Sequence, residues 1–136
     1  MRASTWLLTW AASLAAFLAI DLAWLGWIAR GFYRDRLGAL LRPDVNWTAA
    51  LVFYALYVAA ILLFAVAPAL ERGGLARAAL LGVVFGGVAY ATYDLTNLAT
   101  LRDFPAVVAV VDIAWGCVLT GSVAAVGWTV AQRLTG

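Results

Sequence analysis

The sequence predicts an all-α integral membrane protein, a four-helix transmembrane bundle with a short interfacial helix between its first and second spans. Hydrophobic residues make up 66% of the 136 residues and charged residues only 12%. The mean hydropathy is +0.97, which is more apolar than a soluble domain of this length could cover with polar side chains. The apolar residues fall into four long stretches, and the pattern predicts a single domain, residues 1–136.

Each apolar stretch is long enough, at about 1.5 Å per residue, to cross a hydrocarbon core about 30 Å thick as a helix. The first stretch is too long for a signal peptide, and it lacks a polar cleavage region after a short core. Asn46 is a suitable N-cap for the second helix, and Pro68 followed by the Gly73-Gly74 pair is predicted to close it. The predicted spans are residues 6–29, 47–70, 76–99 and 107–132.

The interfacial helix is predicted in the one sizeable loop, residues 30–46, where four arginines alternate with aromatic residues and leucines. This pattern suits a short helix in the headgroup zone, ended by Pro43. An ordinary charged loop with aromatic anchors and a site for headgroup phosphates fit the pattern equally well. Arg34 and Arg36 are the candidate headgroup contacts, and membrane lipids are the expected partners.

The composition excludes several kinds of chemistry. The chain has no lysine and no histidine, so it has neither a Schiff-base amine nor an ordinary haem or zinc ligand set. We therefore expect no cofactor and no metal, although the ligand types of Asp94, Asn97 and Asp112 leave a hard-cation site as a minor option. The arginines are scattered, which argues against a nucleic-acid partner. Cys117 is the only cysteine, and no basic residue near it would make it a nucleophile.

Three carboxylates inside the apolar stretches are the most informative residues. Asp21, Asp94 and Asp112 each occupy a position where a charge costs at least about 2.5 kcal/mol. Removal from water favours the neutral form of a carboxyl group, so a pair of them can supply both an acid and a base. We therefore take these three aspartates as candidate catalytic residues.

The predicted topology places the three acids at one depth. We define side A as the face with both termini and residues 71–75, and side B as the face with residues 30–46 and 100–106. Counted from the side-B ends of their helices, the acids lie about 8 to 12 Å below that face. The polar and aromatic residues of the same layer are candidate substrate-binding residues: Tyr54, Tyr90, Tyr93, Asn97, Trp24 and Trp115.

One face of the third helix combines glycines with this polar layer. Gly82, Gly86, Tyr90, Asp94 and Asn97 follow helical spacing. The glycine end permits close approach of another helix. That helix could belong to the same bundle, to a second copy of the chain or to a larger membrane complex.

The structural alternative for the acids is that they hydrogen-bond between helices or pair with Arg30, Arg34 or Arg102 reaching down from side B. Trp24 and Trp115 also fit a role as interfacial anchors. For three acids at one depth we favour a functional site over this alternative.

Several motifs carry a family resemblance. They are residues 90–100 (YATYDLTNLAT), Pro105, and residues 111–116 (VDIAWG), 21–26 (DLAWLG) and 32–38 (FYRDRLG). With them the chain resembles, over nearly its whole length, a family of small bacterial membrane proteins known only as a domain of unknown function. The resemblance implies a multi-pass protein of the bacterial inner membrane, with a place in membrane-lipid metabolism.

We therefore expect a membrane-embedded enzyme or binding protein for a lipid or another amphiphile. A small proton-coupled transporter, working as a dual-topology dimer, is the first alternative, because four helices and nearly balanced loop charges would also serve it. A non-catalytic subunit that docks through the Gly82 and Gly86 face is the second. The sequence fits an enzyme and a binding protein equally well.

Overall fold

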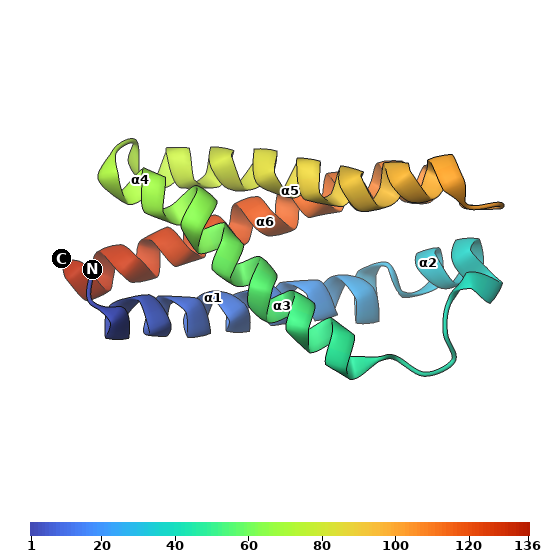
Figure 1. The fold of residues 1–136 in the computed structure, drawn as a ribbon, viewed down its shortest axis with the longest axis horizontal. Helices are drawn as coiled ribbons and strands as arrows, with labels where there is room; N and C mark the ends of the chain where they lie inside the picture. The colour runs from blue at the N-terminus through green and yellow to red at the C-terminus, as the bar shows by residue number, and fades with distance from the viewer.

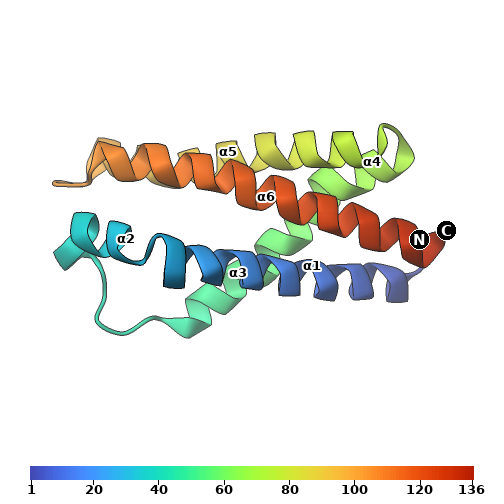
Figure 2. The ribbon, with the colours of Figure 1, turned by 180° about the vertical axis from the view of Figure 1, so that it is seen from behind.

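The computed structural model describes all 136 residues, and every regular element in it is helical (Figure 1). Four of the helices are long and apolar enough to cross a membrane. This confirms the predicted all-α membrane bundle. Both chain termini lie at one end of the bundle, which is side A (Figures 1 and 2). The four spans are Ala3–Ile28, Trp47–Glu71, Gly74–Thr100 and Ala106–Thr135.

The first span consists of α1 (Ala3–Ala23) and one wide π-helical segment, η1 (Trp24–Ile28). The interfacial helix follows as α2 (Arg30–Leu37) and a short 3-10 turn, η2 (Gly38–Leu40). This short helix was predicted, but it ends at Leu40, before the proline that was expected to end it.

Helix α2 lies at the side-B end of the bundle and packs against the beginning of the fourth span (Figure 2). Its Phe32 and Leu37 contact a small buried cluster that contains Phe104 and Val108. The apolar face of α2 thus packs against the protein itself, while Arg34 is exposed on the opposite side of the helix.

The second span is built from three consecutive helical segments. They are α3 (Trp47–Ile61), the π-helical segment η3 (Leu62–Val66) and α4 (Ala67–Glu71). Asn46 is the predicted N-cap: its side chain accepts a hydrogen bond from the Ala49 amide at 3.2 Å.

The second span ends one residue beyond its predicted end at residue 70, and Pro68 does not interrupt it. The helix continues through it to Glu71. In the π-helical turn just before Pro68, the Ala67 amide reaches back five residues to the Leu62 carbonyl. Such a widened turn accommodates a residue that has no N–H group and crowds the preceding carbonyls. The helix ends only at the tight turn where Gly73 has a φ of 97°.

The third and fourth spans, α5 (Gly74–Thr100) and α6 (Ala106–Thr135), form the most extensive helix pair. Glycines bring their backbones together. A Cβ atom added at Gly82 would lie 2.7 Å from the Ala124 Cβ, and one added at Gly86 would collide with the Gly116 carbonyl. The small-residue face of α5 is therefore covered by α6 of the same chain.

The remaining helices close only one half of the bundle. Helix α1 packs along α6, and the hydrophobic core surrounds Phe17, Ile61 and Leu119. On side A, α5 contacts η3 and α4, whereas α3 diverges from α5 as it approaches side B (Figure 1). The bundle is consequently closely packed towards side A and open between α3 and α5 towards side B.

Candidate functional site

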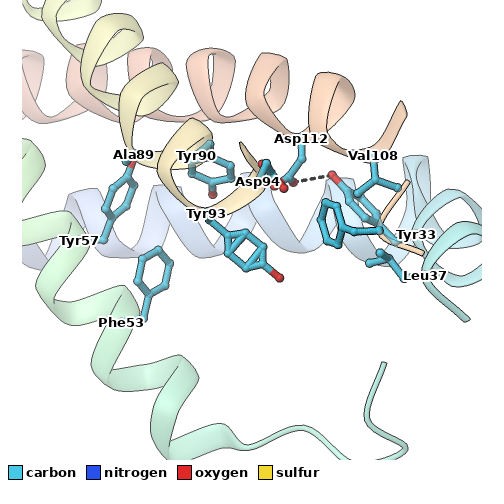
Figure 3. Close-up of a pocket in the computed structure, with 11 residues that line it drawn as sticks. Tyr33, Leu37, Phe53, Tyr57, Ala89, Tyr90, Tyr93, Asp94, Val108 and Asp112 are labelled. Atoms are coloured by element: carbon cyan, nitrogen blue, oxygen red, sulfur yellow. Dashed lines mark hydrogen bonds between the residues drawn. The ribbon is translucent and has the colours of Figure 1, made fainter. Parts of the chain in front are cut away.

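A cavity of about 340 Å³ occupies the opening between α3 and α5 on the side-B half (Figure 3). Two of its residues are largely exposed, Phe53 by 46% and Tyr93 by 58%, so they mark a mouth at the side of the bundle. Most of the wall is apolar or aromatic, and both of its ionisable acids come from spans. The lining residues are Tyr33, Leu37, Phe53, Tyr57, Ala89, Tyr90, Tyr93, Asp94, Phe104, Val108 and Asp112.

Asp112, on α6, is half-buried in the cavity wall and is held by α2. The Tyr33 hydroxyl donates a hydrogen bond to Asp112 Oδ1 at 2.8 Å (Figure 3). The Trp24 indole N–H in turn donates to the Tyr33 oxygen at 3.1 Å. This chain of hydrogen bonds connects η1, α2 and α6, and it uses the only proton that the Tyr33 phenol can donate.

Asp21, on α1, lies behind the cavity and has a partner of its own. The Trp115 indole N–H donates to Asp21 Oδ1 at 3.1 Å. The rings of Trp24 and Trp115 are stacked, with centroids 4.4 Å apart and planes 9° apart. The two tryptophans thus orient one carboxylate directly and the other through Tyr33.

Asp94, on α5, differs from the other two acids. It is fully buried, and neither of its carboxyl oxygens has a hydrogen-bond partner in the chain. Its carboxyl group lies beside that of Asp112, close enough for the two to interact electrostatically (Figure 3). Two adjacent carboxyl groups in an apolar wall need a proton or a cation between them. Asp94 and Asp112 are therefore the candidate acid pair of the cavity.

No arginine supplies that cation. The only ion pair in the protein joins Arg42 to Asp44, at 3.8 Å on the surface. Arg34 is exposed, and Arg36 lies over the Phe32 ring, 4.6 Å from its centroid. The structural alternative is therefore wrong in its ion pairs with side-B arginines, whereas its hydrogen bonds between helices are present at Asp21 and Asp112.

The predicted site residues divide into three groups. The cavity wall contains Tyr90, Tyr93, Asp94 and Asp112. A supporting layer behind it contains Asp21, Trp24 and Trp115. Four predicted residues do not line the cavity: Tyr54, which packs on Phe17 and Phe53, together with Asn97, Arg34 and Arg36.

Sequence reasoning missed Tyr33, Tyr57 and Phe53. Tyr33 was counted only as part of an interfacial helix, although it lies in the motif at residues 32–38. Tyr57 was not counted in the predicted polar layer; its hydroxyl pairs with Thr120 Oγ1 at 2.8 Å. Phe53 carries no sequence signal, because an apolar residue in a membrane span is expected everywhere.

The phenol of Tyr33 is a stable hydrogen-bond donor. Burial raises its pKa above the usual value, and the neighbouring Asp112 charge adds to this, outweighing the opposite effect of the Trp24 hydrogen bond. Tyr33 therefore keeps its proton, and its bond to Asp112, throughout the physiological pH range.

The arrangement combines an acid pair with an aromatic, laterally open cavity. It provides proton exchange between two carboxyl groups and hydrogen-bond acceptors for a polar head. No group of three or more histidine, cysteine, aspartate or glutamate side chains is arranged to hold a metal ion.

The comparison with protein families identifies this architecture. Residues 6–129 match the family described as "Predicted membrane protein (DUF2177)", which confirms the resemblance seen in the motifs. Neither the curated proteins nor the solved structures include a match to the chain. The chain, a multi-helix membrane-spanning protein with an acid pair in a lateral cavity, belongs to the DUF2177 family of predicted membrane proteins.

Proposed function

We propose that this protein binds a membrane amphiphile, with the polar head at the Asp94 and Asp112 pair and the apolar tail leaving between α3 and α5. The observation that carries the proposal is Asp94, a fully buried carboxyl group with two unpartnered oxygens in a cavity wall. Keeping such a group costs stability, so it is expected where a ligand or a reaction needs it.

The position of the mouth supports entry from the bilayer. Tyr93 lies seven residues before the end of α5 at Thr100, which corresponds to about 10 Å below the side-B face. A side chain exposed at that depth of a membrane span faces lipid rather than water. The ligand therefore has to be soluble in the membrane.

The size and composition of the cavity support an amphiphile. A volume of about 340 Å³ lies within the usual range for small-molecule sites. It accommodates a polar head and the first part of a chain, and the rest of the chain can remain in the bilayer. Nine of its eleven lining residues are hydrophobic, and the two acids lie side by side (Figure 3).

The closely packed half of the bundle disfavours passage to side A. Its buried polar residues include Thr9, Ser13 and Thr120, all uncharged and fully buried among closely packed helices. Helices α5 and α6 touch through their backbones there. The groove of about 520 Å³ between α1 and the second span in this half is lined only by hydrophobic residues. Binding, or chemistry on a bound lipid, therefore fits better than transport of a polar solute.

A change in cavity volume tests the proposal. We would purify the protein in a mild maltoside detergent, extract the retained lipids and quantify them by mass spectrometry. We expect one lipid class enriched over the bulk membrane in the wild type and lost in Ala89→Leu, because Ala89 lines the cavity.

Ala99→Leu is the matched control, since Ala99 is exposed on the same helix and does not line the cavity. It should retain the same lipid as the wild type. Equal lipid retention in wild type and Ala89→Leu, with both folded, would contradict binding in this cavity.

A further inference from the structure

We propose that the head of this amphiphile is an ammonium cation; the inference rests on the proposed function and specifies the ligand of the same cavity. Three features of the wall point to a cation: an acid pair without a basic partner, a high content of aromatic residues, and the absence of a cationic side chain that could hold an anion.

The first feature is an acid pair that has no basic partner. Asp94 and Asp112 both line the cavity, and their carboxyl groups lie side by side (Figure 3). No arginine pairs with either, and the chain contains no lysine or histidine. A ligand that carries a positive charge would supply the missing partner of a buried carboxylate.

The second feature is the aromatic content of the wall. A cation is attracted to the face of an aromatic ring within about 6 Å of the centroid. Tyr93 is next to Asp94 in the sequence and stands at the mouth, so a head that reaches the acids passes its ring (Figure 3). The aromatic residues of the wall are Tyr33, Phe53, Tyr57, Tyr90, Tyr93 and Phe104.

The third feature excludes an anionic head such as a phosphate. The lining residues include no arginine, and the Tyr33 hydroxyl already donates to Asp112. The hydroxyl groups of Tyr90 and Tyr93 are neutral donors and would not balance the charge of an anion. Arg34 and Arg36 do not line the cavity. A phosphate would therefore meet two acids and no cation, which is repulsive.

Three probes with the same chain and different heads test the inference: dodecyltrimethylammonium, dodecanol and dodecyl phosphate. Their dissociation constants would be measured by calorimetric titration of the full-length protein in maltoside micelles, with partition into empty micelles subtracted. We expect the ammonium probe to bind at least about tenfold more tightly than either of the others.

Asp94→Asn should weaken binding of the ammonium probe by about tenfold and change dodecanol binding by less than about twofold. Ala99→Leu should match the wild type with all three probes. Tyr93→Leu should weaken ammonium binding more than Tyr93→Phe, because phenylalanine retains an aromatic face. Neither change at Tyr93 alters the acid pair. If Asp94→Asn fails to fold, the two Tyr93 variants therefore still test the inference.

The outcomes separate this inference from the proposed function. Tighter binding of dodecanol or dodecyl phosphate, abolished by Ala89→Leu, would overturn the ammonium head and support the cavity. Equal binding of all three probes would also overturn it. The lipid extraction experiment decides whether an amphiphile binds in the cavity at all, independently of these probes.

Discussion

The two halves of the α5 and α6 pair are built on opposite principles. Towards side A, Gly82 and Gly86 carry no side chain, so the α5 backbone lies against the backbone of α6 and its small side chains. One and two turns further along the same face of α5, Tyr90 and Asp94 take the equivalent positions and line a cavity. A single helix face is thus closely packed at one end and a candidate ligand site at the other.

The difference shows that packing stabilises the side-A half, whereas the side-B half contains groups that lower stability. The side-A half has close backbone approach and a buried apolar core. The side-B half has an unpartnered carboxyl group and a helix, α3, that diverges from its neighbour. Function is expected in the second half, because strained or unsatisfied groups persist where the remaining structure supports them.

Breaking the closely packed half should have the largest effect. Gly86→Leu would place a side chain against the Gly116 carbonyl and Thr120, so α5 and α6 would have to separate. We expect a loss of about 3 kcal/mol in the free energy of unfolding, seen as a large fall in Tm in mild detergent.

Gly26→Ala is the control, since nothing lies within 4 Å of a Cβ added there. It should leave the Tm unchanged or slightly raised. A Gly86→Leu protein with wild-type Tm would mean that the backbone contact between α5 and α6 does not hold the bundle together.

Changing the unpartnered acid should have a smaller effect of opposite sign. Asp94→Asn removes a carboxyl group whose two oxygens have no partner, and its amide can donate to the adjacent Asp112. We expect the free energy of unfolding to rise by about 1 kcal/mol, measured by thermal unfolding without added ligand.

Asp35→Asn, which changes an exposed acid on α2, should leave the Tm unaltered. A clear destabilisation by Asp94→Asn would indicate that Asp94 is a structural hydrogen-bonding residue. The side-B half would then no longer differ from the side-A half by holding an acid kept for function.

Detaching the interfacial helix should have the smallest global effect. Tyr33→Phe removes the hydroxyl that joins Trp24 to Asp112. We expect faster hydrogen exchange in residues 30–37 and a change in Tm equivalent to less than about 1 kcal/mol. Tyr54→Phe, at a tyrosine outside the cavity wall, should change neither quantity. Unaltered exchange in Tyr33→Phe would show that apolar packing alone positions α2.

Much of the architecture was predictable because hydropathy and helix capping are local properties. Asn46 was identified as a cap from residue type and position, and the cap bond is present. The π-helical turn before Pro68 was not predicted, because such a turn leaves no mark in composition.

The candidate site was less predictable from sequence. Helical spacing placed Tyr90 and Asp94 on one face, and both line the cavity. Asn97 shares that spacing but lies beyond the cavity, near the end of α5. Tyr33 could not be assigned to the site, because its place depends on how α2 folds back over the bundle.

By itself, the sequence determined that this chain crosses the membrane four times and carries three carboxylates in its spans. Hydrophobicity and the rise per residue of a helix are sufficient for that conclusion. Only the tertiary structure decided that Asp21 and Asp112 have hydrogen-bond donors while Asp94 has none. The physical reason is that these donors come from other helices, whose rotation and divergence are set by packing across the whole bundle.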